Sequence, residues 1–144
     1  MMRKSLLLTF WMLVGIFFVI LSEFFVPAIR ESFKGSLTFL LPPIIFSLLG
    51  MMLVFLTIKG EMRKILKRFL ILTGVSAAGF FLSILLHNIF YALAVVTVQI
   101  SVLNYLMRIL HVGFFFISIF VCPLGFLIGM IGSIILFFKN YEKE

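Results

Sequence analysis

Residues 59–68 read Lys-Gly-Glu-Met-Arg-Lys-Ile-Leu-Lys-Arg and separate two long apolar runs. This basic decapeptide holds five of the chain's twelve Lys and Arg residues, namely Lys59, Arg63, Lys64, Lys67 and Arg68. Charge at that density is too costly to place in hydrocarbon, so the decapeptide is expected to be a loop or a helix end at a membrane surface. Because positive loops stay on the cytoplasmic side, these five residues are predicted to determine the topology of the chain.

The composition excludes a soluble protein. Hydrophobic residues make up 64% of the 144 residues and charged residues 12%, about half of the roughly 25% charged share that is usual in soluble domains. The net charge of +7 would indicate nucleic acid in a soluble protein, but here the basic residues mostly flank apolar runs. They therefore predict contact with the lipid bilayer and no nucleic-acid partner. The single cysteine, Cys122, excludes an internal disulfide and a Cys-based zinc cluster.

Four apolar runs are long enough to cross a bilayer, since about 20 residues at 1.5 Å each span the roughly 30 Å of hydrocarbon. The predicted helices cover about residues 5–26, 37–58, 69–95 and 112–138. The first run is longer than the usual 7–15 apolar residues of a signal peptide, so it is expected to remain as a helix. The sequence thus predicts an all-α integral membrane bundle of four transmembrane helices, formed as one domain over residues 1–144.

Residues 97–111 carry polar side chains at helical spacing. They are Thr97, Ser101, Asn104, Arg108 and His111, which together form one stripe on an otherwise apolar helix. Such a helix fits the plane of the membrane interface, as a short element before the last crossing. It equally fits an extension of the last helix whose stripe faces the inside of the bundle. The interfacial arrangement is the simpler of the two predictions.

The basic residues are distributed unequally between the two sides that four crossings define. One side carries nine: Arg3, Lys4, Lys59, Arg63, Lys64, Lys67, Arg68, Lys139 and Lys143. The other side carries three: Arg30, Lys34 and Arg108. Because Lys and Arg are enriched in cytoplasmic loops, the sequence predicts a multi-pass protein of the cell membrane with both termini in the cytoplasm.

Small residues recur at four-residue spacing in the last two runs. They are Gly74 and Ala78 in the third run and Gly125, Gly129 and Ser133 in the fourth. Small side chains let helix backbones approach closely, so these positions are predicted to be helix-packing sites. The fourth run is expected to meet either the third run at Gly74 and Ala78 or a second copy of the chain. Pro123 is expected to kink the fourth run near its middle.

No catalytic signature occurs in the sequence: there is no Gly-x-Ser-x-Gly, no His-Glu-x-x-His and no phosphate-binding glycine loop. We therefore predict no enzyme activity, catalytic residue, metal or cofactor. Four ionisable residues, Glu23, His87, Arg108 and His111, are placed near the outer surface by counting along their helices. They are either separate residues at the interface or one polar cluster in which Glu23 pairs with Arg108. The two histidines alone would suit a haem-binding redox protein.

Two classes of function remain open. The first is a small non-enzymatic membrane protein that acts by association with itself or with a larger membrane complex, through its small-residue helix faces. The second is a small oligomeric transporter or channel that uses the outer polar cluster. Against transport, no charged residue lies well inside a predicted helix, where coupled transporters usually keep one.

Overall fold

The computed structural model describes residues 2–32 and 37–141, and every regular element in them is helical. In chain order these are α1 Met2–Phe25, α2 Pro27–Ser32, η1 Leu37–Leu40, α3 Leu41–Lys59, α4 Lys64–Val96, α5 Ser101–Phe116, η2 Ile117–Val121 and α6 Cys122–Tyr141. Four segments are long and apolar enough to cross a membrane: Lys4–Phe25, Thr38–Lys59, Lys64–Val96 and Ser101–Lys139. The predicted all-α class with four membrane-spanning helices is confirmed.

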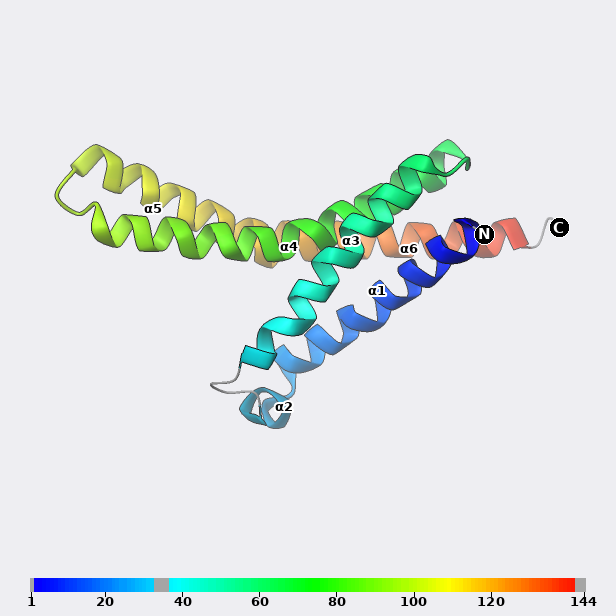
Figure 1. The fold of residues 1–144 in the computed structure, drawn as a ribbon, viewed down its shortest axis with the longest axis horizontal. Helices are drawn as coiled ribbons and strands as arrows, with labels where there is room; N and C mark the ends of the chain where they lie inside the picture. Colours follow the sequence, from blue (N-terminus) through cyan, green and yellow to red (C-terminus); the bar gives the residue numbers. More distant parts are fainter. Residues whose placement is uncertain (1, 33–36, 142–144) are drawn as a thin grey trace.

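The chain forms two helical hairpins that cross one another (Figure 1). In the first hairpin α1 packs against α3, and in the second α4 packs against α5 and α6. α4 is the central element because it also packs along α3. The outer part of α4 and all of α5 extend well beyond α1 and α3 in Figure 1. We call this projecting part, residues 88–116, the α4–α5 arm.

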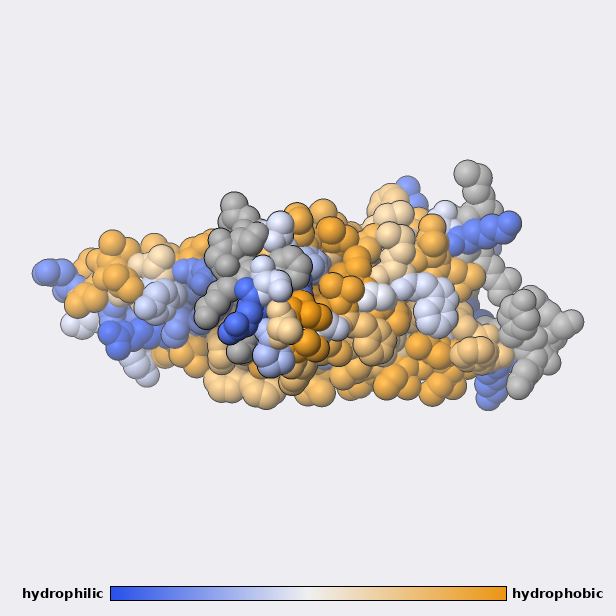
Figure 2. All heavy atoms as spheres, turned by 90° about the horizontal axis from the view of Figure 1, so that it is seen from below, coloured by the Kyte–Doolittle hydropathy of each residue, from blue (hydrophilic) through white to orange (hydrophobic). Residues whose placement is uncertain are grey.

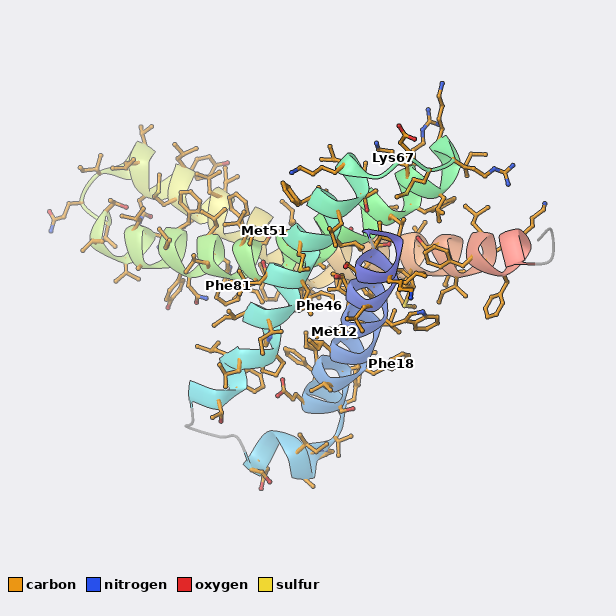
Figure 3. All side chains as sticks on the ribbon, turned by 45° about the vertical axis from the view of Figure 1, so that its right-hand side comes forward. Met12, Phe18, Phe46, Met51, Lys67 and Phe81 are labelled. Carbon is orange, nitrogen blue, oxygen red and sulfur yellow. The ribbon has the colours of Figure 1, made fainter. Side chains whose placement is uncertain are left out.

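The start of α1, the α3–α4 loop and the end of α6 all lie on one side of the molecule, opposite the tip of the arm (Figure 1). At the loop, Lys67 Nζ donates a hydrogen bond to the carbonyl of Ile58 at 3.0 Å (Figure 3). A lysine at this position satisfies one of the last carbonyl groups of α3. Lys59 Nζ lies 4.2 Å from the centre of the Phe55 ring. Lys67 therefore joins the start of α4 to the end of α3, in addition to carrying charge beside the loop.

Two helix boundaries differ from the predicted ones. α4 begins at Lys64, so Lys64, Lys67 and Arg68 lie in its first turns rather than before it. The last run begins earlier still, because α5 leads through η2 directly into α6. A helix is held by its backbone hydrogen bonds, which do not depend on whether the side chains are apolar. Both helices are therefore longer than the apolar runs from which they were predicted. α3 begins at Leu41 with prolines in its first turn, as the Pro42-Pro43 pair indicates.

Glycines bring the helix backbones into direct contact at two places. A Cβ atom on Gly50 of α3 would lie 2.7 Å from the carbonyl oxygen of Gly74 in α4. A Cβ atom on Gly129 of α6 would lie 2.7 Å from the amide nitrogen of Thr73 and 2.9 Å from the carbonyl oxygen of Phe69. No real Cβ atom fits at such distances from backbone. The two contacts use different faces of α4, and they join it to both α3 and α6.

Phenylalanine rings fill the space where the two hairpins cross. Phe126 of α6 lies 4.7 Å from Phe17 of α1 and 5.0 Å from Phe46 of α3, measured between ring centres. Phe46 lies between α3 and α1 in Figure 3. These aromatic contacts connect α1 to α6, so side chains join the two hairpins in addition to the backbone contact between α3 and α4.

Apolar side chains cover much of the outside of the molecule as well as filling its core. Figure 2 shows apolar residues over most of the visible face, with hydrophilic residues toward the two ends of the long axis and around α2. Large side chains such as Phe18, Leu48 and Ile128 are more than half exposed. This surface suits lipid rather than water. The protein is therefore membrane-embedded.

Candidate functional site

The two histidines meet at the base of the α4–α5 arm. The rings of His87 on α4 and His111 on α5 stack with their centres 4.8 Å apart and their planes 21° from parallel. His87 Nδ1 lies 2.8 Å from the backbone carbonyl oxygen of His111. Because a carbonyl group only accepts, Nδ1 must carry the hydrogen, and Nε2 is then the acceptor of the neutral ring. Ring nitrogens of stacked imidazoles point in their own planes, so this pair does not clamp a haem iron between them.

The polar stripe of residues 97–111 lies along α4 rather than at a membrane surface of its own. Asn104 is half-buried and its Nδ2 donates to the carbonyl of Ala94 at 2.5 Å. Thr97 and His111 are also half-buried, whereas Ser101 and Arg108 are exposed. Asn104 and the backbone carbonyl of His111 therefore contact α4, whereas Ser101 and Arg108 do not. Of the two predicted arrangements, the structure shows the extension, because α5 runs through η2 into α6 without a break.

The four-residue polar cluster does not assemble. Glu23 is 3% exposed near the end of α1, and its Oε2 atom has no hydrogen-bond partner among the residues that the structure describes. Arg108 is exposed on α5, and among the described residues its side chain makes no ion pair or hydrogen bond with Glu23. Counting residues along the helices predicted a similar membrane depth for all four. A similar depth does not determine which helices are neighbours or which of their faces meet. The structure joins only His87 and His111.

Within residues 2–32 and 37–141, no three His, Cys, Asp or Glu side chains come together in a way that could hold a metal ion.

The small-residue positions are used inside the chain. Gly125 and Gly129 of α6 face Ser76 and Thr73 of α4. Gly74 faces Gly50 of α3. The third run is therefore the partner of the fourth, as expected, but through a different face from the Gly74 and Ala78 pair. Ala78 also faces α3, since its amide nitrogen would lie 2.7 Å from a Cβ atom on Gly50, and Ser133 is fully buried.

A cavity of about 470 Å³ lies beside the crossing of the hairpins, and nothing in the sequence indicated it. It is partly open and is lined from α1, α3, α4, α5, η2 and α6. Most of its walls are Phe, Ile and Leu side chains, with Ser76, Ser118, Cys122 and His87 as the polar ones. The cavity escaped prediction because it is formed between α1, α3, α4 and the continuous helix of α5, η2 and α6, and the sequence does not show how these segments pack together.

One wall of the cavity is the π-helix η2, which precedes Pro123. The amide of Cys122 donates to the carbonyl of Ile117, five residues earlier, and Ser118 Oγ donates to the carbonyl of Phe115 at 2.8 Å. Pro123 has no amide hydrogen and so cannot continue the regular helical pattern. Just before Pro123, where the sequence predicts a kink, the helix forms one wide π-helical turn. Single π-helical turns of this kind are frequent at functional sites.

No protein-family model, no curated protein and no solved structure matches this chain. Its function is therefore inferred from its own residues and geometry.

Proposed function

We propose that this chain is a non-enzymatic multi-pass membrane protein that acts by association, either with itself or with a larger membrane complex, and that the α4–α5 arm is its contact surface. The small-residue faces do not support that role, because they hold α3, α4 and α6 to one another. The transporter alternative needed four polar groups at one place, and only two of them meet. The arm is what supports association.

The arm extends beyond the thickness of a bilayer. Counting from Phe69, just after the basic residues of α4, about 20 residues cross the roughly 30 Å of hydrocarbon and reach Asn88. Counting back from Lys139, the same length of helix ends near Ile119. Residues 88–116 therefore lie outside the hydrocarbon when α4 and α6 stand upright. A soluble projection would have a polar surface there.

The surface of the arm is instead largely apolar. α5 contains no buried residue, and Val102, Val96 and Tyr105 are 82%, 75% and 69% exposed. Of its polar residues, Asn104 and His111 are half-buried, and Ser101 and Arg108 are exposed. Contiguous apolar patches of more than a few hundred Å² are rare on a surface that meets water, and they commonly mark contacts with protein or membrane. A protein partner would cover this surface without requiring the helices to tilt.

The orientation that we propose places both termini and the α3–α4 loop in the cytoplasm. Its support is the nine-to-three distribution of basic residues. The arm would then point away from the cytoplasm, so the partner contact would form on the outer side of the cell membrane.

Photo-cross-linking tests the association directly. A benzophenone amino acid replaces Val102 on the arm, and in a matched control it replaces Ile128, which is 57% exposed on α6. We expect protein adducts from position 102 and lipid adducts alone from position 128. Dimeric adducts in vesicles that contain only the purified chain indicate self-association. Lipid adducts alone from both positions, in vesicles and in native membranes, would mean that tilt buries the arm in the bilayer and would overturn the proposal.

A further inference from the structure

The cavity beside the hairpin crossing is about as long as one leaflet of the hydrocarbon core is thick. Along α4 its wall runs from Ser76 to His87, eleven residues or about 16 Å of helix, which is about half of the roughly 30 Å hydrocarbon core. His87 lies about 27 Å along the helix from Phe69, at the boundary opposite the basic loop. By the same count Ser76 lies about 10 Å from Phe69, so the cavity runs from about one third of the way across the hydrocarbon to its outer boundary, in the direction that a lipid chain takes.

The walls of the cavity suit hydrocarbon. Phe17, Phe46, Phe80 and Phe126 line its deeper part, together with aliphatic side chains. Ser118 already donates its hydroxyl hydrogen to a backbone carbonyl, so its polarity is largely used. An apolar cavity of about 150 Å³ is known to stay dry and to bind benzene, and this one is about three times as large. Its volume lies in the range of ligand pockets, roughly 300–1,000 Å³.

One polar group stands at the outer end of the cavity. His87 lines it, while the Nδ1 atom of the same ring is held by the carbonyl of His111. Stacking against His111 and a ring contact with Phe115, 5.4 Å between centres, fix the plane of the imidazole. With Nδ1 occupied as a donor, Nε2 is the atom left to bind a ligand, and in the neutral ring it accepts a hydrogen bond. The matching group on a ligand is a hydroxyl.

We infer that this cavity binds a single-chain lipid that ends in a hydroxyl group, with its hydrocarbon chain among the phenylalanines and its hydroxyl donating to His87 Nε2. The π-helical turn before Pro123 maintains the space, because a regular helix at η2 would move Ser118 and Ile119. The site is separate from the outward surface of the α4–α5 arm, so its occupancy does not depend on the proposed association.

A photoreactive hexadecanol, carrying a diazirine in its chain, tests the site in detergent-purified protein. The blocking variant is Ile119→Trp, because Ile119 lines the cavity and is 47% exposed, so the larger ring has room to turn inward. Ile117→Trp on the same turn is the matched control, since Ile117 does not line the cavity. We expect labelling of wild type and Ile117→Trp, at peptides of α1 and η2, and at least a tenfold loss in Ile119→Trp. Equal labelling of all three proteins would overturn the inference.

The polar end is tested by competition between unlabelled hexadecanol and hexadecane. We expect wild type to prefer the alcohol by about three- to tenfold, which corresponds to one hydrogen bond. His87→Phe keeps an aromatic ring but removes the acceptor, so the preference should disappear while labelling persists. His111→Phe is the control, because it retains the backbone carbonyl that holds His87. A preference that survives in His87→Phe would show that His87 does not bind the hydroxyl.

Discussion

Glu23 is the residue least suited to its surroundings. Its side chain is 3% exposed near the end of α1, and Oε2 has no hydrogen-bond partner in residues 2–32 and 37–141. A buried polar group without a partner costs about 1–3 kcal/mol of folding free energy. Either the carboxyl group of Glu23 has a stabilising role, or its burial only lowers the stability of the protein. A substitution of Glu23 distinguishes these two possibilities.

We predict that Glu23→Leu raises the free energy of unfolding by about 1–3 kcal/mol, since it removes the unsatisfied oxygen atoms. Unfolding in mixed detergent micelles measures the change. Ser22→Ala, at the neighbouring half-buried position, should change stability by less than about 0.5 kcal/mol. If Glu23→Leu lowers stability instead, the carboxyl group has a stabilising partner. The effects of Glu23→Leu and Arg108→Gln should add, because the two residues do not contact one another.

At the scale of the helices, the contact between α6 and α4 depends on Gly129. The three atoms closest to a Cβ at this position belong to Thr73 and Phe69, and two of them are backbone atoms of α4. Backbone cannot rotate out of the way as a side chain can. The helices would have to separate, with loss of the dispersion contacts that replace the hydrophobic effect in lipid.

Gly129→Ala should therefore destabilise the protein by about 1–3 kcal/mol, as overpacking does in a tight interface. Gly113→Ala is a matched control, because a Cβ atom there meets nothing within 4 Å. In α5, Gly113→Ala should leave the free energy of unfolding unchanged or raise it by up to about 1 kcal/mol. Thermal unfolding of both variants in the same detergent makes the comparison. Equal melting temperatures would contradict the close contact between α4 and α6.

At the scale of the whole molecule, orientation can be tested by reporter fusions. Fusions after Gly60 and Glu144 should report the cytoplasm and fusions after Lys34 the outside, because nine of twelve basic residues lie on one side. Changing Lys64, Lys67 and Arg68 to Gln should produce a mixed orientation. An outside signal at Glu144 together with a cytoplasmic signal at Gly60 would require an odd number of crossings after Gly60 and would contradict the four-helix topology. Outside signals at both positions would contradict the orientation.

The sequence by itself determined the class and the number of crossings. A charged residue in hydrocarbon is costly, so the apolar runs and the basic decapeptide that divides them were sufficient to predict four membrane helices. The start of α3 at Leu41 agrees with the Pro42-Pro43 pair, since proline has no amide hydrogen and is tolerated in the first turn of a helix. The small residues predicted close helix contacts in the third and fourth runs, but they left open whether the fourth run meets the third run or a second copy of the chain.

Only the tertiary structure decided which face of each helix is inside. In a soluble protein, the contrast between polar and apolar faces reveals this, but in lipid both faces are apolar and the contrast is lost. Gly74 and Thr73 are neighbours in the sequence, yet one faces α3 and the other α6. Three features depend on how each helix is rotated about its own axis. They are the contacts among Phe17, Phe46 and Phe126, the separation of Glu23 from Arg108, and the cavity that His87 lines. Side-chain packing determines these rotations, and it is decided only when the helices are assembled.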